Sequence, residues 1–256
     1  MRYLRALAPA LATALSLAVV QQARSAESLQ QEKVLVHVDW KEGIPKEVEV
    51  EARSSGLEIL KESDGQSAIK ASILKEANYS GVANGSPRAE VQFSNQFRFQ
   101  QGSSYRVRWS TYIPQEFEID EKKFIIFTQV HQGDRSGPPT LALTILGENY
   151  AISQRGGDNP QQISAGKKFC CVSNDIGKWV NWKMDYTPSD SGAGSLTKLW
   201  KDGVEIFEAT GKSNTYKGDN EAYIKFGLYK PHWTEESSTN EKVSMLFGPI
   251  TISQGK

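Results

Sequence analysis

Three short segments of the chain carry polar side chains at alternating positions with apolar residues between them. They are Arg88-Ala-Glu90-Val-Gln92, Gln129-Val-His131 and Tyr223-Ile-Lys225-Phe-Gly227-Leu-Tyr229. In an extended strand alternate side chains share one face, so each segment separates a polar face from an apolar one. The polar faces together offer a guanidinium, a carboxamide, an imidazole, an ammonium and two phenols. That set of groups suits an acidic sugar polymer.

The third segment is the most specific of the three because a glycine interrupts its polar face. Gly227 falls between Lys225 and Tyr229. Glycine weakens a strand, and it often marks a bulge or the close approach of a ligand or another backbone. Two interpretations stay open: a gap for a sugar ring flanked by a cation and a phenol, or a solvent-facing strand with a bulge.

The other two segments each supply a polar pair. Gln129 and His131 follow an apolar run at 124–127. A single histidine beside a buried strand is more often structural than catalytic. Glu90 is positioned to hold the Arg88 guanidinium so that it meets a carboxylate through two parallel hydrogen bonds. The alternative is a surface ion pair, which contributes little to stability.

The three segments in this order resemble the jelly-roll polysaccharide lyases, a group that includes alginate lyases, glucuronan lyases and a class of heparin lyases. The alginate-lyase pattern reads Arg-(Ser/Thr/Asn)-Glu-(Leu/Val)-Arg, Gln-(Ile/Val)-His and Tyr-x-Lys-x-Gly-x-Tyr-x-Gln. The matching residues are Arg88, Glu90, Val91, Gln129, Val130, His131, Tyr223, Lys225, Gly227 and Tyr229. Ala89, Gln92 and Pro231 depart from it, which favours a glucuronan- or heparin-type substrate over alginate.

The resemblance implies β-elimination at a uronic acid. Loss of the C5 proton leaves an enolate-like dianion, so the adjacent carboxylate must first be neutralised, and Arg88 and Gln129 are the candidates for that role. A base then removes the proton and an acid protonates the leaving oxygen. Tyr229 is the expected acid, and also the base if both eliminated groups lie on one face. His131 is the base for the opposite stereochemistry, or otherwise a donor to the carboxylate.

Further substrate-binding residues are expected around these catalytic groups. Free tyrosine has a pKa near 10, so a basic Tyr229 needs a nearby cation, and Lys225 on the same strand face is the candidate. Glu90 and Tyr223 complete the polar faces. Lys230 and Trp233 follow the third segment and are expected either to line a sugar subsite or to pack in the core. The chemistry requires no metal or cofactor.

Two other classes of protein compete with a lyase. A glycoside hydrolase would use paired carboxylates, which Glu116, Glu118 and Asp120 offer at alternate positions. Pro114 before them and two lysines after them favour a solvated loop instead. A non-catalytic carbohydrate-binding module would hold a glycan in the same groove without reacting.

The elements that position these residues are short β-type runs separated by turns. Their spacing predicts a β-sandwich, and the resemblance specifies a β-jelly-roll of two antiparallel sheets with a concave substrate groove. The expected strands are 34–40, 68–73, 88–93, 105–113, 124–131, 141–146, 150–154, 179–186, 196–200, 204–209, 222–229 and 243–252. Lys201-Asp202-Gly203 predicts a tight hairpin. Weak helical tendency is confined to 58–62 and 72–77, and loops at 80–87, 133–139, 156–166 and 189–195 are expected to rim the groove.

The first residues of the 256-residue chain predict a secretory signal peptide over 1–25. Arg2 and Arg5 precede an apolar run at 6–20, and Ala23-Arg24-Ser25 has the small-x-small form of a cleavage site. The remaining residues, 26–256, are expected to form a single secreted or periplasmic lyase domain, working as a monomer without a membrane anchor.

The charge balance constrains the partner. Removing the three arginines of 1–25 leaves 27 basic residues against 30 acidic ones, a net charge of −3. An acidic polysaccharide must therefore be held by a local basic patch, and nucleic acid is not an expected partner.

Two further features concern cysteine and calcium. Cys170 and Cys171 are adjacent, and consecutive Cα atoms lie about 3.8 Å apart, below the usual disulfide range, so either a reduced pair or a strained vicinal disulfide is expected. No neighbouring His or Cys supports a zinc site.

The acidic loop Gly218-Asp219-Asn220-Glu221 offers oxygen ligands for a structural calcium ion, or forms an ordinary polar turn.

Overall fold

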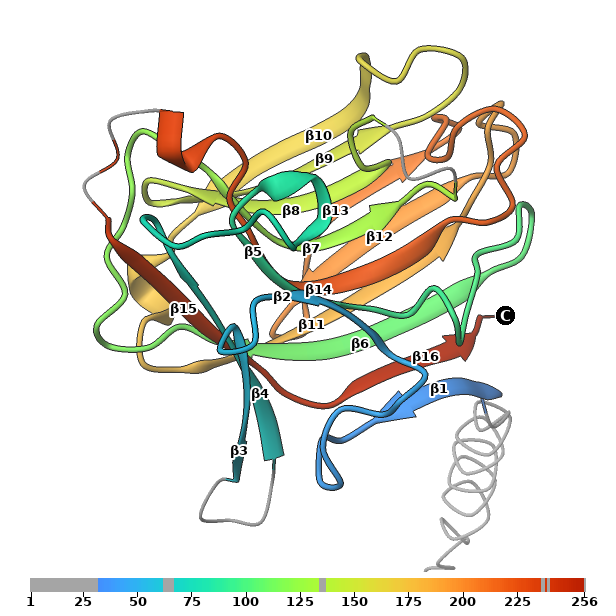
Figure 1. The fold of residues 1–256 in the computed structure, drawn as a ribbon. Helices are drawn as coiled ribbons and strands as arrows, with labels where there is room; N and C mark the ends of the chain where they lie inside the picture. The colour runs from blue at the N-terminus through green and yellow to red at the C-terminus, as the bar shows by residue number, and fades with distance from the viewer. Residues whose placement is uncertain (1–31, 62–66, 134–136, 236–237, 239, 256) are drawn as a thin grey trace, which may run out of the picture. The chain divides into compact units, whose positions relative to one another are not determined.

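Two antiparallel β-sheets face each other in the computed structural model, which describes residues 32–61, 67–133, 137–235, 238 and 240–255 (Figure 1). The larger sheet follows the order β13-β12-β11-β6-β15-β4-β3, and β16 pairs with both β6 and β1. Its strands are β1 (Val34–Val38), β3 (Leu57–Lys61), β4 (Ser67–Leu74), β6 (Tyr105–Tyr112), β11 (Trp179–Thr187), β12 (Leu196–Lys201), β13 (Val204–Thr210), β15 (Lys242–Phe247) and β16 (Ile250–Gln254).

The second sheet follows the order β10-β9-β8-β7-β14-β5-β2. Its strands are β2 (Glu49–Ala52), β5 (Arg88–Gln92), β7 (Ile125–His131), β8 (Leu141–Leu146), β9 (Asn149–Arg155), β10 (Ile163–Cys170) and β14 (Tyr223–Tyr229). Only three short 3-10 turns interrupt the described strands and loops: η1 (Ala83–Gly85), η2 (Ser173–Asp175) and η3 (Trp233–Glu235). The all-β prediction is confirmed, and the arrangement is a β-jelly-roll sandwich.

The core lies between the inner faces of the two sheets. Trp109 of β6 stacks on Trp182 of β11 with ring centroids 6.1 Å apart, and Trp109 also lies 5.6 Å from Phe226 of β14. The apolar residues that alternate with the polar motif residues, such as Val91 and Val130, are 1% exposed or less. The apolar faces of the three segments therefore hold the second sheet on the core and leave their polar faces on its outer side.

The Asp-Gly hairpin forms as predicted. Asp202 and Gly203 both adopt positive φ, 49° and 80°, between the paired residues Lys201 and Val204. Such values belong to the type I′ turn, whose twist matches that of the flanking strands.

Several predicted boundaries are wrong. Residues 57–61 form strand β3 rather than helix because they pair with β4, and β4 itself continues to Leu74 into the second segment predicted as weakly helical. Strand β10 begins inside the predicted 156–166 loop, and β2 was not expected. The predicted strand 243–252 is two strands, separated at Gly248 and Pro249.

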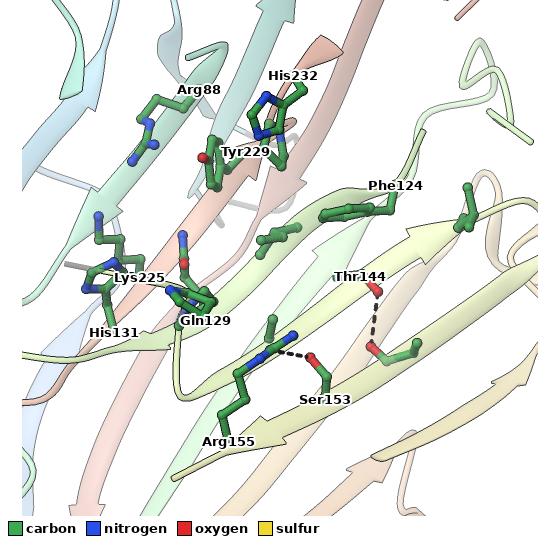
Figure 2. A pocket seen from close by; sticks show the side chains of 18 of the residues that line it. Arg88, Phe124, Gln129, His131, Thr144, Ser153, Arg155, Lys225, Tyr229 and His232 are labelled. Atoms are coloured by element: carbon green, nitrogen blue, oxygen red, sulfur yellow. Dashed lines mark hydrogen bonds between the residues drawn. The ribbon is translucent and has the colours of Figure 1, made fainter. Parts of the chain in front are cut away.

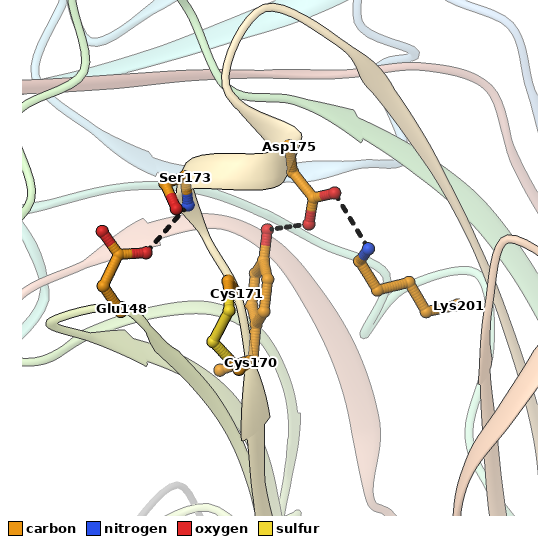
Figure 3. The surroundings of a disulfide bond; sticks show 7 residues. Glu148, Cys170, Cys171, Ser173, Asp175 and Lys201 are labelled. Carbon is orange, nitrogen blue, oxygen red and sulfur yellow. Dashed lines mark hydrogen bonds and ion pairs between the residues drawn. A yellow bond between two sulfur atoms is a disulfide. The ribbon is translucent and has the colours of Figure 1, made fainter.

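A disulfide joins Cys170 and Cys171 at the end of β10 (Figure 3), which selects the oxidised alternative. Just beyond it, Asp175 of η2 accepts hydrogen bonds from Tyr150 of β9 at 2.7 Å and from Lys201 of β12 at 2.9 Å. Burial and the Asp175 carboxylate raise the pKa of Tyr150. This polar cluster ties the segment after β10 to both sheets.

Residues 34–256 cluster as one compact unit. The predicted signal peptide, 1–25, lies outside the described residues. Among the residues that are described, no helix has the length and apolar character needed to cross a bilayer.

Candidate active site

The strand register brings the three motifs together on one face of the second sheet. Strand β14 lies between β5 and β7, so that its residues are opposite residues of both neighbours. The cross-strand pairs are Tyr229 with Arg88, Gly227 with Glu90, Lys225 with Gln129, and Tyr223 with His131. Directly opposite residues present their side chains on the same face. Residues more than 130 positions apart in the chain thus become neighbours.

This face forms the floor of a groove with a volume of about 900 Å³ (Figure 2). The motif residues that line it are Arg88, Gln129, His131, Tyr223, Lys225 and Tyr229. Outer-face residues of β8, β9 and β10 extend it, including Ala142, Thr144, Ser153, Arg155, Ile163 and Lys168. Of the loops predicted to rim it, 80–87 contributes Ala83 and Asn84, and 133–139 contributes Gly137, Pro138 and Pro139.

A buried ion-pair network organises the motif half of the groove. One Glu51 oxygen accepts hydrogen bonds from Arg88 Nη1 and Lys225 Nζ, each at 2.8 Å. Arg88 Nη2 donates to Asn84 Oδ1 at 2.8 Å. Burial alone would raise the pKa of Glu51, but Lys225 and Arg88 outweigh it and hold the pKa below its usual value. Glu51 is therefore the anionic centre that fixes both cations.

Glu90 connects the first motif to the second. Its carboxylate accepts a hydrogen bond from Gln129 Nε2 at 2.5 Å and lies 3.4 Å from Arg88 Nη1. The expected contact between Glu90 and Arg88 is present, although Arg88 is held more closely by Glu51. Complete burial raises the pKa of Glu90, against the opposing effect of Lys225 and Arg88. The hydrogen bond to Glu90 fixes the orientation of the Gln129 amide group.

Tyr229 is half-buried, and the cation closest to its ring is Arg88 rather than Lys225. The Arg88 guanidinium carbon lies 4.0 Å from the Tyr229 ring centroid, while the Lys225 ammonium pairs with Glu51. The prediction that Lys225 supplies the positive charge next to Tyr229 is corrected accordingly. A guanidinium stacked on the ring face is a favourable cation–π arrangement.

His131 is a neutral imidazole with a defined tautomer. Its Nδ1 lies 3.1 Å from the backbone carbonyl of Gln132. A carbonyl only accepts hydrogen bonds, so Nδ1 carries the hydrogen and Nε2 keeps its lone pair. Burial, reinforced by Lys225, lowers the pKa of His131 to about 4. The ring is therefore a proton acceptor near neutral pH. It packs beside the buried Tyr223, with ring centroids 5.7 Å apart.

Gly227 is required by the neighbouring strand rather than by a ligand. It has φ of 137°, and an added Cβ would lie 2.6 Å from the Cα of Glu90 and closer still to the carbonyl of Ala89. The pairing between β14 and β7 shifts between Phe226 and Tyr229. Of the two interpretations, the bulge is correct, and the predicted gap for a sugar ring is not formed here.

Lys230 and Trp233 lie outside the groove. Both side chains are buried, and Lys230 Nζ donates to Asp120 at 2.6 Å while contacting the Trp233 ring at 4.4 Å from its centroid. Trp233 in turn donates to Ser238 at 3.0 Å. The expectation that these two line a sugar subsite is corrected, because they form a polar cluster within the protein.

The carboxylates of the hydrolase alternative are also outside the groove. Glu116 and Glu118 are exposed in the loop between β6 and β7. Burial opposes ionisation of Asp120, but hydrogen bonds from Lys230 and Ser238 lower its pKa to about 2. The groove therefore lacks the carboxylate pair that hydrolysis would take from this segment.

The acidic loop considered for calcium uses its carboxylate internally. The two Asp219 oxygens accept the backbone N–H groups of Gly133 and Glu221, at 3.1 and 2.8 Å. Within the described part of the chain, no group of three or more His, Cys, Asp and Glu side chains has the arrangement of a metal site. The loop fits a polar turn, and a structural calcium ion stays a prediction.

Comparison with known proteins identifies the family of the chain. The model of the polysaccharide lyase family matches residues 38–246, which include all three motifs, and the chain therefore belongs to that family. It is a polysaccharide lyase. No curated protein sequence matches the chain.

Solved structures with the same fold include several lyases. An endo-β-1,4-glucuronan lyase from the fungus Trichoderma reesei superposes with a TM-score of 0.65 at 14% identity, covering 81% of this chain and 90% of that one. The alginate lyase Aly36B gives 0.60 at 12% identity, with coverages of 88% and 99%. The alginate lyase AlyA1 from Zobellia galactanivorans gives 0.53 at 17% identity, with coverages of 75% and 79%. At these identities the likeness concerns the fold.

Proposed function

We propose that this lyase cleaves a uronic-acid polysaccharide by β-elimination, with polyglucuronate favoured over alginate and heparin-type chains. The observation that carries the proposal is the meeting of a neutral His131, the Gln129 amide and the Tyr229 phenol on one groove floor. The phenol can act as base and acid, the amide as donor to the substrate carboxylate, and the imidazole as base where the eliminated groups lie on opposite faces.

Neutralisation of the substrate carboxylate falls to Gln129 and Arg88. One hydrogen of the Gln129 amide nitrogen is committed to Glu90, which leaves its second hydrogen for the substrate. Arg88 is already shared between Glu51 and Asn84, so its main contribution is a fixed positive charge beside the reacting unit. Donors fixed before the reaction stabilise developing charge without reorganisation.

The elimination itself moves one proton and one leaving group. In a D-glucuronate unit the C5 proton and the C4 oxygen lie on the same face of the ring, so one group can serve both. The Tyr229 phenolate, beside the Arg88 cation, takes the C5 proton, the C4–O bond breaks, a C4–C5 double bond forms, and the resulting phenol donates that proton to the departing oxygen. Because Nδ1 is bound to a carbonyl, His131 keeps its Nε2 lone pair, and it is the proposed base where the two eliminated groups lie on opposite faces, as in the guluronate units of alginate.

Polyglucuronate is favoured by the departures from the alginate-lyase pattern at Ala89, Gln92 and Pro231. The likeness to a glucuronan lyase structure is consistent with this choice. We further propose that residues 1–25 direct export, so that the enzyme acts as a monomer in the periplasm or outside the cell, where such polymers are encountered.

The test is a side-by-side incubation of the full protein with polyglucuronate, alginate and heparin. Elimination leaves an unsaturated uronate at each new end, which absorbs in the ultraviolet. We expect that absorbance to rise fastest with polyglucuronate. New reducing ends without the absorbance would indicate hydrolysis, and binding without either would indicate a carbohydrate-binding module.

A further inference from the structure

The cations of the motif half of the groove are already matched by anions. Arg88 and Lys225 share Glu51, and Glu90 lies beside them. This half of the groove therefore has little positive charge in excess. A polyanion bound along the whole groove must find its other partners elsewhere on the floor.

Arg155, at the end of β9, is a groove-lining cation of a different kind. Its side chain is half-buried and extends into the groove (Figure 2). Nη1 makes a long 3.4 Å hydrogen bond to Ser153, and the buried Nε has no acceptor in the described residues. Among those same residues no carboxylate pairs with it. A guanidinium stays charged at any physiological pH, so burying it without an anion is costly.

The sheet register places Arg155 away from the reacting unit. Its N–H bonds to the carbonyl of Thr140, just before β8, and the next residue, Leu141, is opposite Val130 of β7. Arg155 is thus level with His131 but two strands further across the sheet. Strands are spaced about 4.8 Å apart, which separates the two backbones by roughly 10 Å.

We propose that Arg155 binds the carboxylate of a second uronate unit, on the β8–β10 side of the unit that reacts. This inference rests on the proposed function and adds a subsite to it. The planar guanidinium accepts a carboxylate through two parallel hydrogen bonds, and such an anion would satisfy the buried Nε. The exposed Lys168 on the neighbouring strand β10 adds positive charge along the same direction.

The test compares Arg155→Ala with the wild type on oligouronates of increasing length. We expect KM to rise about tenfold or more for chains long enough to reach Arg155, because charge-assisted hydrogen bonds are lost, with kcat nearly unchanged. The shortest cleaved oligomer should be unaffected. Arg155→Lys keeps the positive charge but not the planar guanidinium, so its KM should lie between those of the wild type and Arg155→Ala. Lys46→Ala, an exposed cation outside the groove, is the matched control.

A binding measurement separates this inference from the proposed chemistry. Calorimetry with Tyr229→Phe as background compares the affinity for a long oligouronate with and without Arg155→Ala. A loss of about tenfold supports the subsite even if no unsaturated product is ever detected. Equal affinities, or a KM change that is the same at every chain length, would overturn it. Absence of binding by the Tyr229→Phe protein to any oligouronate would overturn both proposals. If Arg155→Ala does not fold, Arg155→Gln replaces it.

Discussion

The protonation state of His131 sets the lower pH limit of elimination at uronate units whose C5 proton and C4 oxygen lie on opposite faces, where His131 is the proposed base. Burial lowers the pKa of this imidazole to about 4, so the ring stays neutral and basic well below its ordinary value of 6.5. We predict that kcat/KM on the guluronate units of alginate falls only as the pH drops through about 4, because that parameter reports the free enzyme. A pH profile, with the His131 titration followed by NMR, checks this. An acidic limb near 6.5 would contradict the buried environment.

Glu51 is the residue whose charge holds the site together. Replacing it with Gln leaves Arg88 and Lys225 buried with one fewer carboxylate. We predict that Glu51→Gln lowers the free energy of unfolding by about 3 kcal/mol, since an uncompensated buried charge is strongly destabilising. Denaturant unfolding measures this. Glu47→Gln, at an exposed position, should change stability by less than about 0.5 kcal/mol. Similar losses of stability in the two variants would contradict this role of Glu51.

At the scale of the strands, Gly227 sets the spacing between β14 and β5. An added methyl group would meet the backbone of Ala89 and Glu90 in a conformation with φ of 137°. We predict that Gly227→Ala destabilises the protein by about 3 kcal/mol and reduces activity through the displaced Tyr229. Gly194→Ala is the matched control, because Gly194 also has positive φ but open space around it. Its cost should be about 1 kcal/mol. Thermal unfolding compares the two, and equal shifts would show that steric contact with β5 is unimportant.

Period-two alternation made the central strands predictable. In β5, β7 and β14 the sequence itself separates polar from apolar faces, so the motif residues could be assigned to one side. Strand β3 was mistaken for helix, because five residues with mixed polarity carry no clear period. Strand β2 is absent from the predicted strands, and Glu51, which contacts Arg88 from 37 positions away, is absent from the predicted site residues. Glu49 and Glu51 alternate with Val50, and that pattern was the available signal.

Proximity in sequence misled the assignment of Lys230 and Trp233. Lys230 directly follows Tyr229 in an extended segment, so its side chain points to the opposite face. Pro231 and His232, the latter with φ of 55°, still line the groove, and the chain leaves it at Trp233. Lys230 pairs with Asp120 of a distant loop, and the Trp233 ring packs against the Lys230 ammonium. A turn geometry of this kind depends on long-range contacts that the local sequence does not encode.

At the scale of the whole molecule, the sandwich turns one sheet face into a catalytic surface. The core fixes the inner face of the second sheet, and the seven strands of that sheet present motif residues at one end and Arg155 and Lys168 at the other. The fold class and the meeting of the motifs followed from the sequence. The extent of the groove did not, because it depends on β10, which is absent from the predicted strands.

Turnover of polyglucuronate by wild type and Tyr229→Phe, with binding measured in parallel, tests the proposed elimination. We predict that the wild type produces unsaturated uronate ends. The variant, which lacks only the phenolic hydroxyl group, should lose at least about 1,000-fold in kcat while binding the polymer with unchanged affinity. Full turnover by Tyr229→Phe, or new reducing ends without ultraviolet absorbance from the wild type, would contradict the account.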